Sequence, residues 1–366
     1  MPTDHRAHRV RRLDSMAPRD GHRSPSLDLS RAVSNAPVDR SSSRLIVCLM
    51  NVHTSVCIPT YNRPDYLEEA LASVLRQSDG ALEVVVGDDS TNAQTKQVVQ
   101  RHIAEGAPIR YVRNTPPRGQ SQNVDRLMQA AAGDYIVLLH DDDRLVDGAL
   151  ETLRACFANH PNVDVAFGKQ QVITSDGDPH PALTRELNRT YHRTPAHSGR
   201  QPSNLRSAIT QQFPNNGYMI RSAIAKDVGY VHPHAGDACD FVFGVEVAKA
   251  ASGAFYYHDV CTAQYRLSEG SILRGDATND AGYQAFKYVL RELPASVQED
   301  RVVQQWLTLC APEAVMRAAE NGHVRDGFEW FVGPYHQPHI LSLGGVRRLL
   351  YLLYAVASSR WGANRG

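Results

Sequence analysis

The stretch Gly133-Asp-Tyr-Ile-Val-Leu-Leu-His-Asp-Asp-Asp143 decides the fold of this chain. It begins at a glycine that stops the helical pattern before it, continues through an apolar run over 135–139, and ends in His140 and three aspartates. A short apolar run between turn residues is typical of a buried strand. Adjacent carboxylates repel one another unless a cation neutralises them. The stretch therefore predicts a buried strand that carries an acidic cluster to the edge of a sheet.

The residues alone allow two interpretations of this cluster. Mg²⁺ and Mn²⁺ prefer carboxylate oxygens and fill their remaining positions with phosphate oxygens, so the cluster is a candidate metal site. Alternatively, it is a solvated turn in front of the helix expected over 148–159, because acidic residues are favourable near a helix N-terminus. The apolar strand in front of the cluster favours the metal interpretation.

Strand and helix patterns alternate on both sides of this stretch. Apolar strands are expected at 55–58, 82–87, 109–112 and 163–167, and helices at 64–77, 94–104, 123–132 and 148–159. Such alternation predicts an α/β domain with a mostly parallel sheet flanked by helices. Ligands bind such sheets beyond the carboxyl ends of the strands. Thr60, the pair Asp88 and Asp89, and the acidic cluster all follow strands and are expected at that edge.

The domain is expected to cover residues 53–275. Residues 1–52 hold nine Arg and are expected to be a disordered basic tail, unless translation begins at Met50. Residues 176–212 are polar with weak periodicity and are expected to form a long loop or lid. Residues 276–366 carry helical patterns and are expected to form a C-terminal appendage.

Composition excludes several classes of protein. The 39 basic residues balance 39 acidic ones, so no overall positive charge favours nucleic acid as a partner. The six cysteines form no CxxC pair, which argues against a disulfide scaffold or a structural zinc site and suits the cytoplasm. An apolar run long enough to span a bilayer is absent from the sequence, as is the apolar core of a secretory signal.

The order of three motifs resembles the family 2 glycosyltransferases with the GT-A fold. These are Val56-Cys-Ile-Pro-Thr-Tyr-Asn-Arg63, Val84-Val-Val-Gly-Asp-Asp-Ser90 and the Gly133–Asp143 stretch. The resemblance runs from Thr54 to about Ser271. It implies an inverting transfer of a sugar from a nucleotide-diphosphate donor to the hydroxyl of a saccharide or lipid-linked acceptor, assisted by Mg²⁺ or Mn²⁺. Synthesis of a cell-surface polysaccharide or glycolipid is the implied setting.

The resemblance also assigns residues by position. The metal ligand is Asp142, supported by Asp141 and Asp143, with His140 where the family has its first acid. The general base is Asp240, and Asp237 is the second candidate. The residues expected to hold the donor are Pro59, Thr60, Asn62, Arg63, Asp88, Asp89, Arg118, Asn123, Asp141 and Arg266.

Two other functions fit the same residues. A metal-dependent nucleotidyltransferase would use the same acidic edge. A non-catalytic nucleotide-sugar-binding protein is the other, because His140, Cys239 and Ser268 stand where the family has other residues. Turnover of a nucleotide sugar separates the transferase from the binding protein.

The C-terminal segment from Leu341 to Val356 has apolar residues at helical spacing beside Arg347, Arg348 and Arg360. A basic amphipathic helix of this kind can lie on an anionic membrane surface, here the inner face of the cell membrane. The alternative is that the apolar stripe packs on the rest of the chain as ordinary core.

Overall fold

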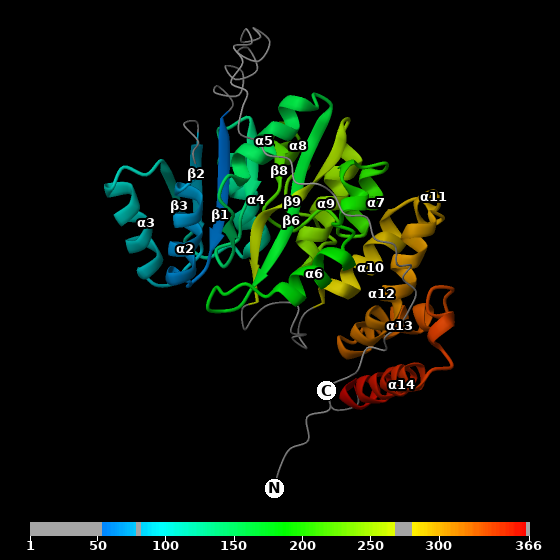
Figure 1. The fold of residues 1–366 in the computed structure, drawn as a ribbon. Helices are drawn as coiled ribbons and strands as arrows, with labels where there is room; N and C mark the ends of the chain where they lie inside the picture. The colour runs from blue at the N-terminus through cyan, green and yellow to red at the C-terminus, as the bar shows by residue number, and fades with distance from the viewer. Residues whose placement is uncertain (1–52, 78–81, 268–279, 364–366) are drawn as a thin grey trace. The chain divides into compact units, whose positions relative to one another are not determined.

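The structure is a computed structural model that describes residues 53–77, 82–267 and 280–363. The expected N-terminal tail and Ser268 lie outside the described residues. Strands of the described part form a single sheet in the order β3-β2-β1-β4-β8-β6-β9-β5, and β7 pairs with β9 (Figure 1). The strands are β1 Thr54–Thr60, β2 Leu82–Asp88, β3 Ile109–Arg113, β4 Tyr135–Leu138, β5 Arg144–Leu145, β6 Val163–Ile173, β7 Gly199–Arg200, β8 Met219–Arg221 and β9 Ala254–Arg266.

Helices cover both faces of this sheet and continue beyond it. The first group is α2 Pro64–Leu75, α3 Gln94–Ala104, α4 Gln120–Ala130, α5 Ala149–Asn159, α6 Pro181–Thr190, α7 Asn204–Ile209, α8 Ser222–Val228 and α9 Cys239–Ala250. The C-terminal group is α10 Ala281–Glu292, α11 Ala295–Gln298, α12 Arg301–Glu320, α13 Val324–Phe331 and α14 Leu343–Ala363. Short 3-10 turns are η1 Pro195–His197, η2 Gly236–Ala238 and η4 Gln337–His339.

Alternation along β1 and β2 divides the core between the two faces of the sheet. Val56 and Ile58 point into the cluster that includes Leu67 of α2 and Val99 of α3. Cys57, between them, points into the opposite cluster with α4. Successive residues of a strand face opposite sides, so helices pack on both faces. The α/β fold class predicted from the sequence is confirmed.

The sheet is parallel in the half that carries the candidate site and mixed in the other half. β3, β2, β1 and β4 are parallel, with Thr54 opposite both Leu82 and Tyr135. β8 is antiparallel to both β4 and β6, and β6 is parallel to β9. Because β1 to β4 share one direction, their carboxyl ends meet at one edge.

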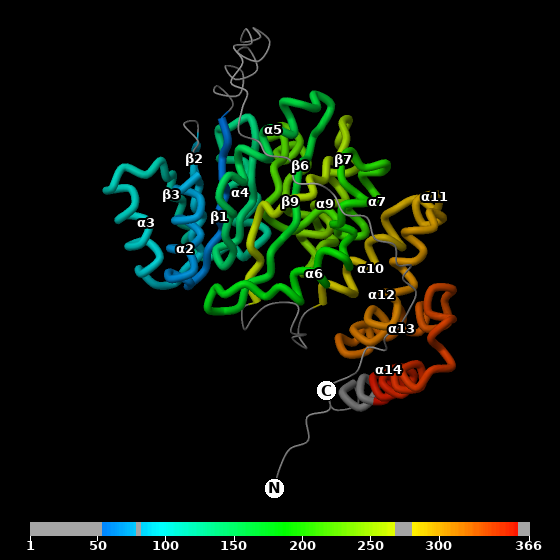
Figure 2. The backbone as a smooth tube through the Cα atoms, viewed as in Figure 1, coloured from blue at the N-terminus to red at the C-terminus, as the bar shows by residue number. Residues whose placement is uncertain are grey.

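The prediction of a loop over residues 176–212 is wrong in part. The chain leaves β6, forms α6, and returns through β7 and α7, a path that Figure 2 traces. α6 lies against β6 through polar groups: Asn188 accepts a hydrogen bond from the Gln170 N–H and donates to the Gln170 carbonyl, and the Thr184 hydroxyl accepts from the Val172 N–H. Asn188 is the only buried residue of α6, so the helix contributes no apolar residue to the core and its sequence resembles that of a polar loop.

The C-terminal helices pack on α7 and α9. The ring of Trp306 in α12 stacks on Phe241 of α9 at 5.6 Å, and Arg206 of α7 pairs with Asp300, 2.5 Å away, at the start of α12. Tyr283, Phe286 and Leu307 belong to the same apolar cluster as Cys57. Among the described residues, the helices after residue 275 therefore share an apolar core with the sheet. The domain boundary expected near residue 275 stays a prediction.

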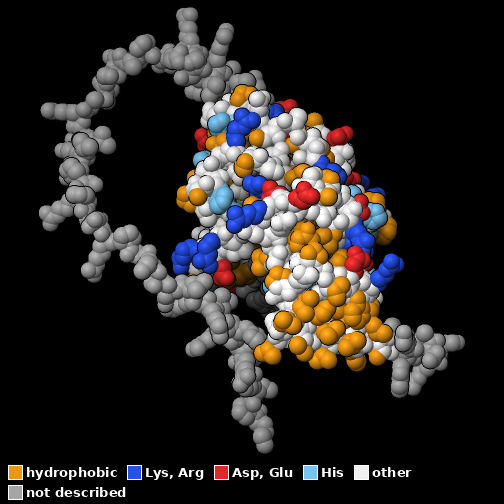
Figure 3. Space-filling view, turned by 90° about the vertical axis from the view of Figure 1, so that its right-hand side faces the viewer, with side chains coloured by type: hydrophobic (Ala, Val, Ile, Leu, Met, Phe, Trp, Pro, Cys, Tyr) orange, Lys and Arg blue, Asp and Glu red, His pale blue; other side chains and the backbone are white. Residues whose placement is uncertain are grey.

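The end of the chain differs from the rest in its surface. Apolar side chains gather at the lower end of the face drawn in Figure 3, where Figure 1 places α13 and α14. None of the described helices is long and apolar enough to cross a membrane.

Candidate active site

Two acidic turns lie at the carboxyl edge of the parallel strands. The first follows β2 and contains Asp88 and Asp89, and the second follows β4 and runs from His140 to Asp143. Strand β1 lies between β2 and β4 in the sheet, and its last residue, Thr60, pairs with Asp88 of β2. The sequence predicted that these segments meet at one edge, and the register places them there.

The β2 turn uses the Asp88 carboxylate to join neighbouring segments. Asp88 is fully buried, and it accepts hydrogen bonds from the Ser90 N–H at 2.7 Å, the Tyr111 hydroxyl at 2.5 Å and the Arg113 guanidinium at 2.6 Å. Burial, followed by the hydrogen bond to Asp88, raises the pKa of Tyr111 to about 12, so the phenol stays a donor. Both oxygens of Asp88 thus hold protein groups.

Asp89 organises the loop that leads into α4. One carboxylate oxygen accepts from the Asn114 amide at 2.6 Å, and the other accepts from the N–H groups of Arg118 and Gly119 at 3.1 and 2.8 Å. Asn114 also donates to Asn123, 3.0 Å away, and Asn123 donates to the Gly87 carbonyl at 2.8 Å. The side chain of Arg118, which belongs to this loop, is exposed.

Residues after β1 connect the two turns. The backbone of Asn62 adopts a left-handed conformation (φ 54°), and its side-chain oxygen accepts hydrogen bonds from Thr91 and Asn92 in the β2 turn. The next residue, Arg63, contacts the β4 turn instead. Its guanidinium pairs with Asp142 at 3.0 Å and Asp141 at 3.4 Å. The Thr60 hydroxyl, after Pro59, is buried beside the Asp141 carboxylate and lowers its pKa, against the larger effect of burial, which raises it.

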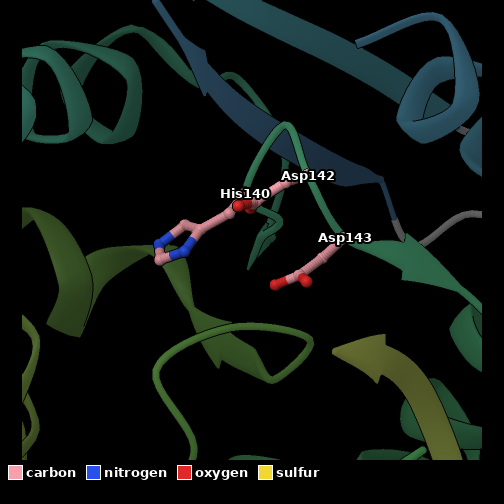
Figure 4. A group of neighbouring side chains, drawn as sticks. All are labelled: His140, Asp142 and Asp143. Atoms are coloured by element: carbon pink, nitrogen blue, oxygen red, sulfur yellow. The ribbon is translucent and has the colours of Figure 1, made fainter. Parts of the chain in front are cut away.

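The β4 turn gathers three groups that could bind a metal ion. Ligand atoms of His140, Asp142 and Asp143 all lie within 4.8 Å of one another. Figure 4 shows the three side chains leaving one turn of the chain. Of the two acids that pair with Arg63, Asp142 is the more exposed, with 17% of its side chain accessible against 8% for Asp141. Asp141 also accepts a hydrogen bond from the Tyr61 N–H at 3.4 Å.

Asp143 is buried and braced from two sides. Its Oδ1 accepts from the Arg266 N–H at 2.8 Å, and its Oδ2 accepts from the Asn216 side-chain amide. Asn216 accepts in turn from Gln170, which accepts from Arg193 at 2.7 Å. Asp143 is therefore oriented by elements that are distant in the sequence.

The pKa values of three side chains in the β4 turn are raised. Burial raises the pKa of Asp143 to about 8, with Asp142 adding to the effect. Burial also raises the pKa of Asp141 to about 6, and Arg63 opposes the shift. Burial by itself would lower the pKa of His140, but nearby carboxylates raise it above its ordinary value. Burial and neighbouring carboxylates thus both disfavour the charged forms of the acids, and a nearby cation favours those forms.

A divalent cation fits this group. The Nε2 atom of His140 is buried and has no hydrogen-bond partner within the described part of the chain. Imidazole nitrogen and carboxylate oxygen are both ligands of Mn²⁺, and carboxylate oxygen is the preferred ligand of Mg²⁺. His140, Asp142 and Asp143 could hold the ion.

Asp240 faces the β4 turn from the start of α9. Among the carboxylates, it makes the largest contribution to the raised pKa of His140, ahead of Asp143. The hydroxyl of Tyr230 donates to Asp240 Oδ1, while the Tyr230 N–H donates to Asp125 at 2.8 Å. Burial raises the pKa of Tyr230 well above its usual value, so the phenol stays a donor and fixes the carboxylate. Asp240 itself is half-buried.

Asp237 lies apart from these groups. It is exposed on η2, and its carboxylate accepts from the Asp280 N–H at 3.1 Å, next to the first turn of α10. The contact belongs to the packing of α10 against η2.

Arg266 is directed into the protein. Its guanidinium donates to the carbonyls of Asp142 at 2.8 Å and Ser175 at 2.6 Å and to Glu69, and it stacks over Tyr66 at 4.8 Å. With only 2% of the residue exposed, it stabilises the backbone that presents the β4 turn.

Sequence reasoning missed Tyr230, Asn216 and Gln170, which support the site. One signal was present: Asn215-Asn-Gly217 is a turn sequence, and the left-handed backbone of Gly217 (φ 69°) lets its N–H donate to the Leu138 carbonyl at 2.8 Å. The side chain of Tyr230 gave no signal, because its partner is set by the packing of α8 and α9.

The fold and this edge define a protein of the GT-A class, and structural comparison agrees. The chain matches Staphylococcus aureus TarS 1–349 in complex with UDP-GlcNAc with a TM-score of 0.54 and 20% identity, over 83% of this chain and 81% of that one. It matches the mannosyltransferase PcManGT from Pyrobaculum calidifontis, in complex with GDP-Man and Mn²⁺, with a TM-score of 0.50 and 16% identity, over 85% and 88%. At these identities the likeness concerns the fold.

Sequence comparison finds the same family resemblance in part of the chain. Residues 55–218 match the model of glycosyl transferase family 2. The chain is 38% identical over 100 residues to the Campylobacter jejuni GalNAc(5)-diNAcBac-PP-undecaprenol beta-1,3-glucosyltransferase, covering 27% of this chain and 32% of the relative. It is 34% identical over 119 residues to the Salmonella typhimurium abequosyltransferase RfbV, covering 32% and 36%. The chain spans about a third of the length of the curated relatives it matches. Residues 55–218 therefore carry a region similar to glycosyltransferase family 2, as the motifs predicted.

Proposed function

We propose that the chain is an inverting glycosyltransferase that moves a sugar from a nucleotide-diphosphate donor to an acceptor hydroxyl. One observation carries the proposal: His140 lies with Asp142 and Asp143 in one group of possible metal ligands, and Asp240 is near enough to that group to raise the pKa of His140. A transferase of this type needs a base on the acceptor side and positive charge on the diphosphate side, close together.

Asp240 is the proposed general base. It takes the proton of the acceptor hydroxyl while the oxygen forms a bond to the anomeric carbon. The bond from that carbon to the diphosphate breaks, and the nucleoside diphosphate leaves with the electron pair. Attack on the face opposite the leaving group inverts the anomeric centre. The Tyr230 hydroxyl keeps the carboxylate aimed, since a base must lie within hydrogen-bond reach of its proton.

Asp142 and His140 are the proposed main ligands of Mg²⁺ or Mn²⁺, and Asp143 and Asp141 complete the acidic surroundings. When bound, the ion supplies positive charge to the departing diphosphate. The Arg63 side chain pairs with Asp141 and Asp142 and is 40% exposed. It therefore has room to turn from these acids toward the phosphate oxygens of a donor.

Other donor residues divide into two groups. Thr60 offers a hydroxyl at the end of β1 and Arg118 an exposed cation, and both are proposed to contact the nucleotide. Asp88, Asp89, Asn62 and Asn123 are proposed to act by holding the loops that receive it. Arg266 is proposed to act through the backbone of Asp142 rather than on the diphosphate.

The named relatives support a setting in cell-surface glycan synthesis, with a saccharide or lipid-linked acceptor. One is a glucosyltransferase whose name specifies an undecaprenol-linked glycan, and another is an abequosyltransferase. We propose the cytoplasmic side of the membrane as the place of action.

The test is a pair of matched substitutions. Asp240→Asn is expected to lower turnover by roughly 10² or more, the usual range for a general base, with little change in donor affinity. Asp237→Asn, three residues earlier and exposed, is the control and should keep most of its activity. Sugar transfer is measured with Mn²⁺ over a panel of nucleotide sugars and acceptors, and donor affinity by calorimetry.

Three outcomes contradict the proposal. A larger loss in Asp237→Asn would move the base to Asp237. Donor binding by the unaltered chain without turnover over the acceptor panel would indicate a binding protein. Release of a sugar 1-phosphate rather than a nucleoside diphosphate would indicate a nucleotidyltransferase.

A further inference from the structure

Helix α14 is apolar on two opposite sides. Its inner side packs against α12 and α13, where Leu352 is fully buried and reaches Gly327 so closely that a Cβ there would lie 2.6 Å from its Cδ2 atom. Leu349 is partly buried in the same cluster. This side confirms that part of the stripe is ordinary core.

The outer side carries a second stripe. Leu343, Leu350 and Tyr354 recur at helical spacing and are 92%, 61% and 72% exposed. Val346 and Leu353 flank them, both more than half exposed, and Leu341 lies just before the helix at 98% exposure. These six residues are here called the outer stripe. Figure 3 shows apolar side chains gathered at the lower end of the molecule, where Figure 1 places α13 and α14. A helix with apolar side chains on all its sides is normally buried on all of them. We therefore expect the outer stripe to be covered by a binding partner.

The sequence of the C-terminal segment carries charge of one sign. Residues 330–366 contain four arginines, at 347, 348, 360 and 365, and no aspartate or glutamate. Arg347 is exposed, and its guanidinium lies over the Tyr351 ring at 5.5 Å. Arg348 instead donates to the His336 imidazole at 2.9 Å, which ties the helix to the preceding turn.

We propose that the outer stripe of α14 docks into the surface of an anionic lipid bilayer. The 21-residue helix is about 31 Å long, and it lies along the membrane with its apolar side chains among the acyl chains. Arg347 reaches lipid phosphate groups, and Tyr351 and Tyr354 lie at the depth of the headgroups, where amphipathic rings are favourable.

A second copy of the chain fits this face less well. A symmetric dimer sets the same patch against itself. Arg347 would then face an Arg-bearing segment that holds no acid between residues 330 and 366 to pair with it. An anionic membrane is complementary to both the apolar and the cationic side chains of this face.

Membrane docking does not depend on the proposed transfer reaction, so the two are tested separately. The full chain is floated with vesicles of equal parts phosphatidylglycerol and phosphatidylcholine, and with vesicles of phosphatidylcholine alone. It is expected to float with the anionic vesicles. Leu343→Gln/Leu350→Gln is expected to lower the partition coefficient at least tenfold, and Arg347→Gln about fivefold. The matched control is Ile103→Gln/Val260→Gln, which changes two exposed apolar residues on α3 and β9 and should float normally.

Donor binding by each variant is measured in parallel, and it should be unchanged because the outer stripe is remote from the sheet edge. Failure of the unaltered chain to float overturns the proposal, as does equal flotation of the stripe variant. A dimer in sedimentation that Leu343→Gln/Leu350→Gln converts to monomer, without vesicle binding, makes a second copy the occupant and also overturns it.

Discussion

The two acidic turns at the sheet edge have similar sequences and different structures. In the β2 turn the carboxylates of Asp88 and Asp89 accept six hydrogen bonds between them from surrounding segments. In the β4 turn the buried Nε2 of His140 has no partner among the described residues, and the pKa values of Asp141 and Asp143 are raised.

This difference separates a structural turn from a ligand site. A carboxylate whose lone pairs hold N–H and O–H donors is stabilised as an anion and holds loops together. Neighbouring carboxylates in a buried turn favour a bound cation, because burial and mutual repulsion both disfavour their charged forms. An unpartnered imidazole nitrogen and neighbouring carboxylates thus lie together at the place where we propose that the donor diphosphate binds.

The largest expected effect is the loss of metal binding on changing Asp142. Asp142→Asn removes one negative charge and a ligand oxygen, and it is expected to abolish metal-dependent donor binding while the fold stays intact. Calorimetry with Mn²⁺ and a nucleotide sugar measures the first, and the melting temperature measures the second. Asp147→Asn, at an 86% exposed side chain five residues later, is the control. Normal donor and metal affinity in Asp142→Asn would show that the cluster is a solvated turn.

An intermediate effect is expected from the residue that orients Asp143. Asn216→Ala removes the donor to the Asp143 carboxylate, and loss of such an outer partner typically lowers metal affinity by about 10- to 100-fold. The matched change at the other turn is Asn114→Ala, which removes the donor to Asp89. Both asparagines are buried, so both variants lose stability, but only Asn216→Ala should change Mn²⁺ affinity. Equal Mn²⁺ affinity in the two variants would remove the distinction between the turns.

The smallest expected effect concerns Asp88. Asp88→Asn leaves Arg113 and Tyr111 facing an amide instead of a carboxylate, which should lower the free energy of unfolding by about 2 kcal/mol. The estimate is at the low end because 29% of the Arg113 side chain is exposed to water. Urea unfolding measures it. Asp142→Asn should cost almost nothing in the same experiment, because it relieves repulsion, and a cost as large as that of Asp88→Asn would contradict the comparison.

The sequence predicted the parallel half of the fold closely. Expected strands at 55–58, 82–87 and 109–112 correspond to β1, β2 and β3, since each is a local run of apolar residues with turn residues at its ends. It could not predict α6, whose contacts with β6 are hydrogen bonds of Asn188 and Thr184. It predicted the two acidic turns equally and could not tell them apart, because their partners come from other strands and helices.

What the sequence determined by itself is the order of elements and the chemistry at the strand ends, because periodicity and turn residues act over a few positions. Tertiary structure alone decided which carboxylates are used. Asn216 reaches Asp143 across 73 residues and Arg266 across 123, and such contacts depend on sheet order and register. It also decided which side of α14 is core: the sequence gives apolar residues all round the helix, and only packing on α12 and α13 determines that Leu352 is buried while Leu343 and Leu350 face outward.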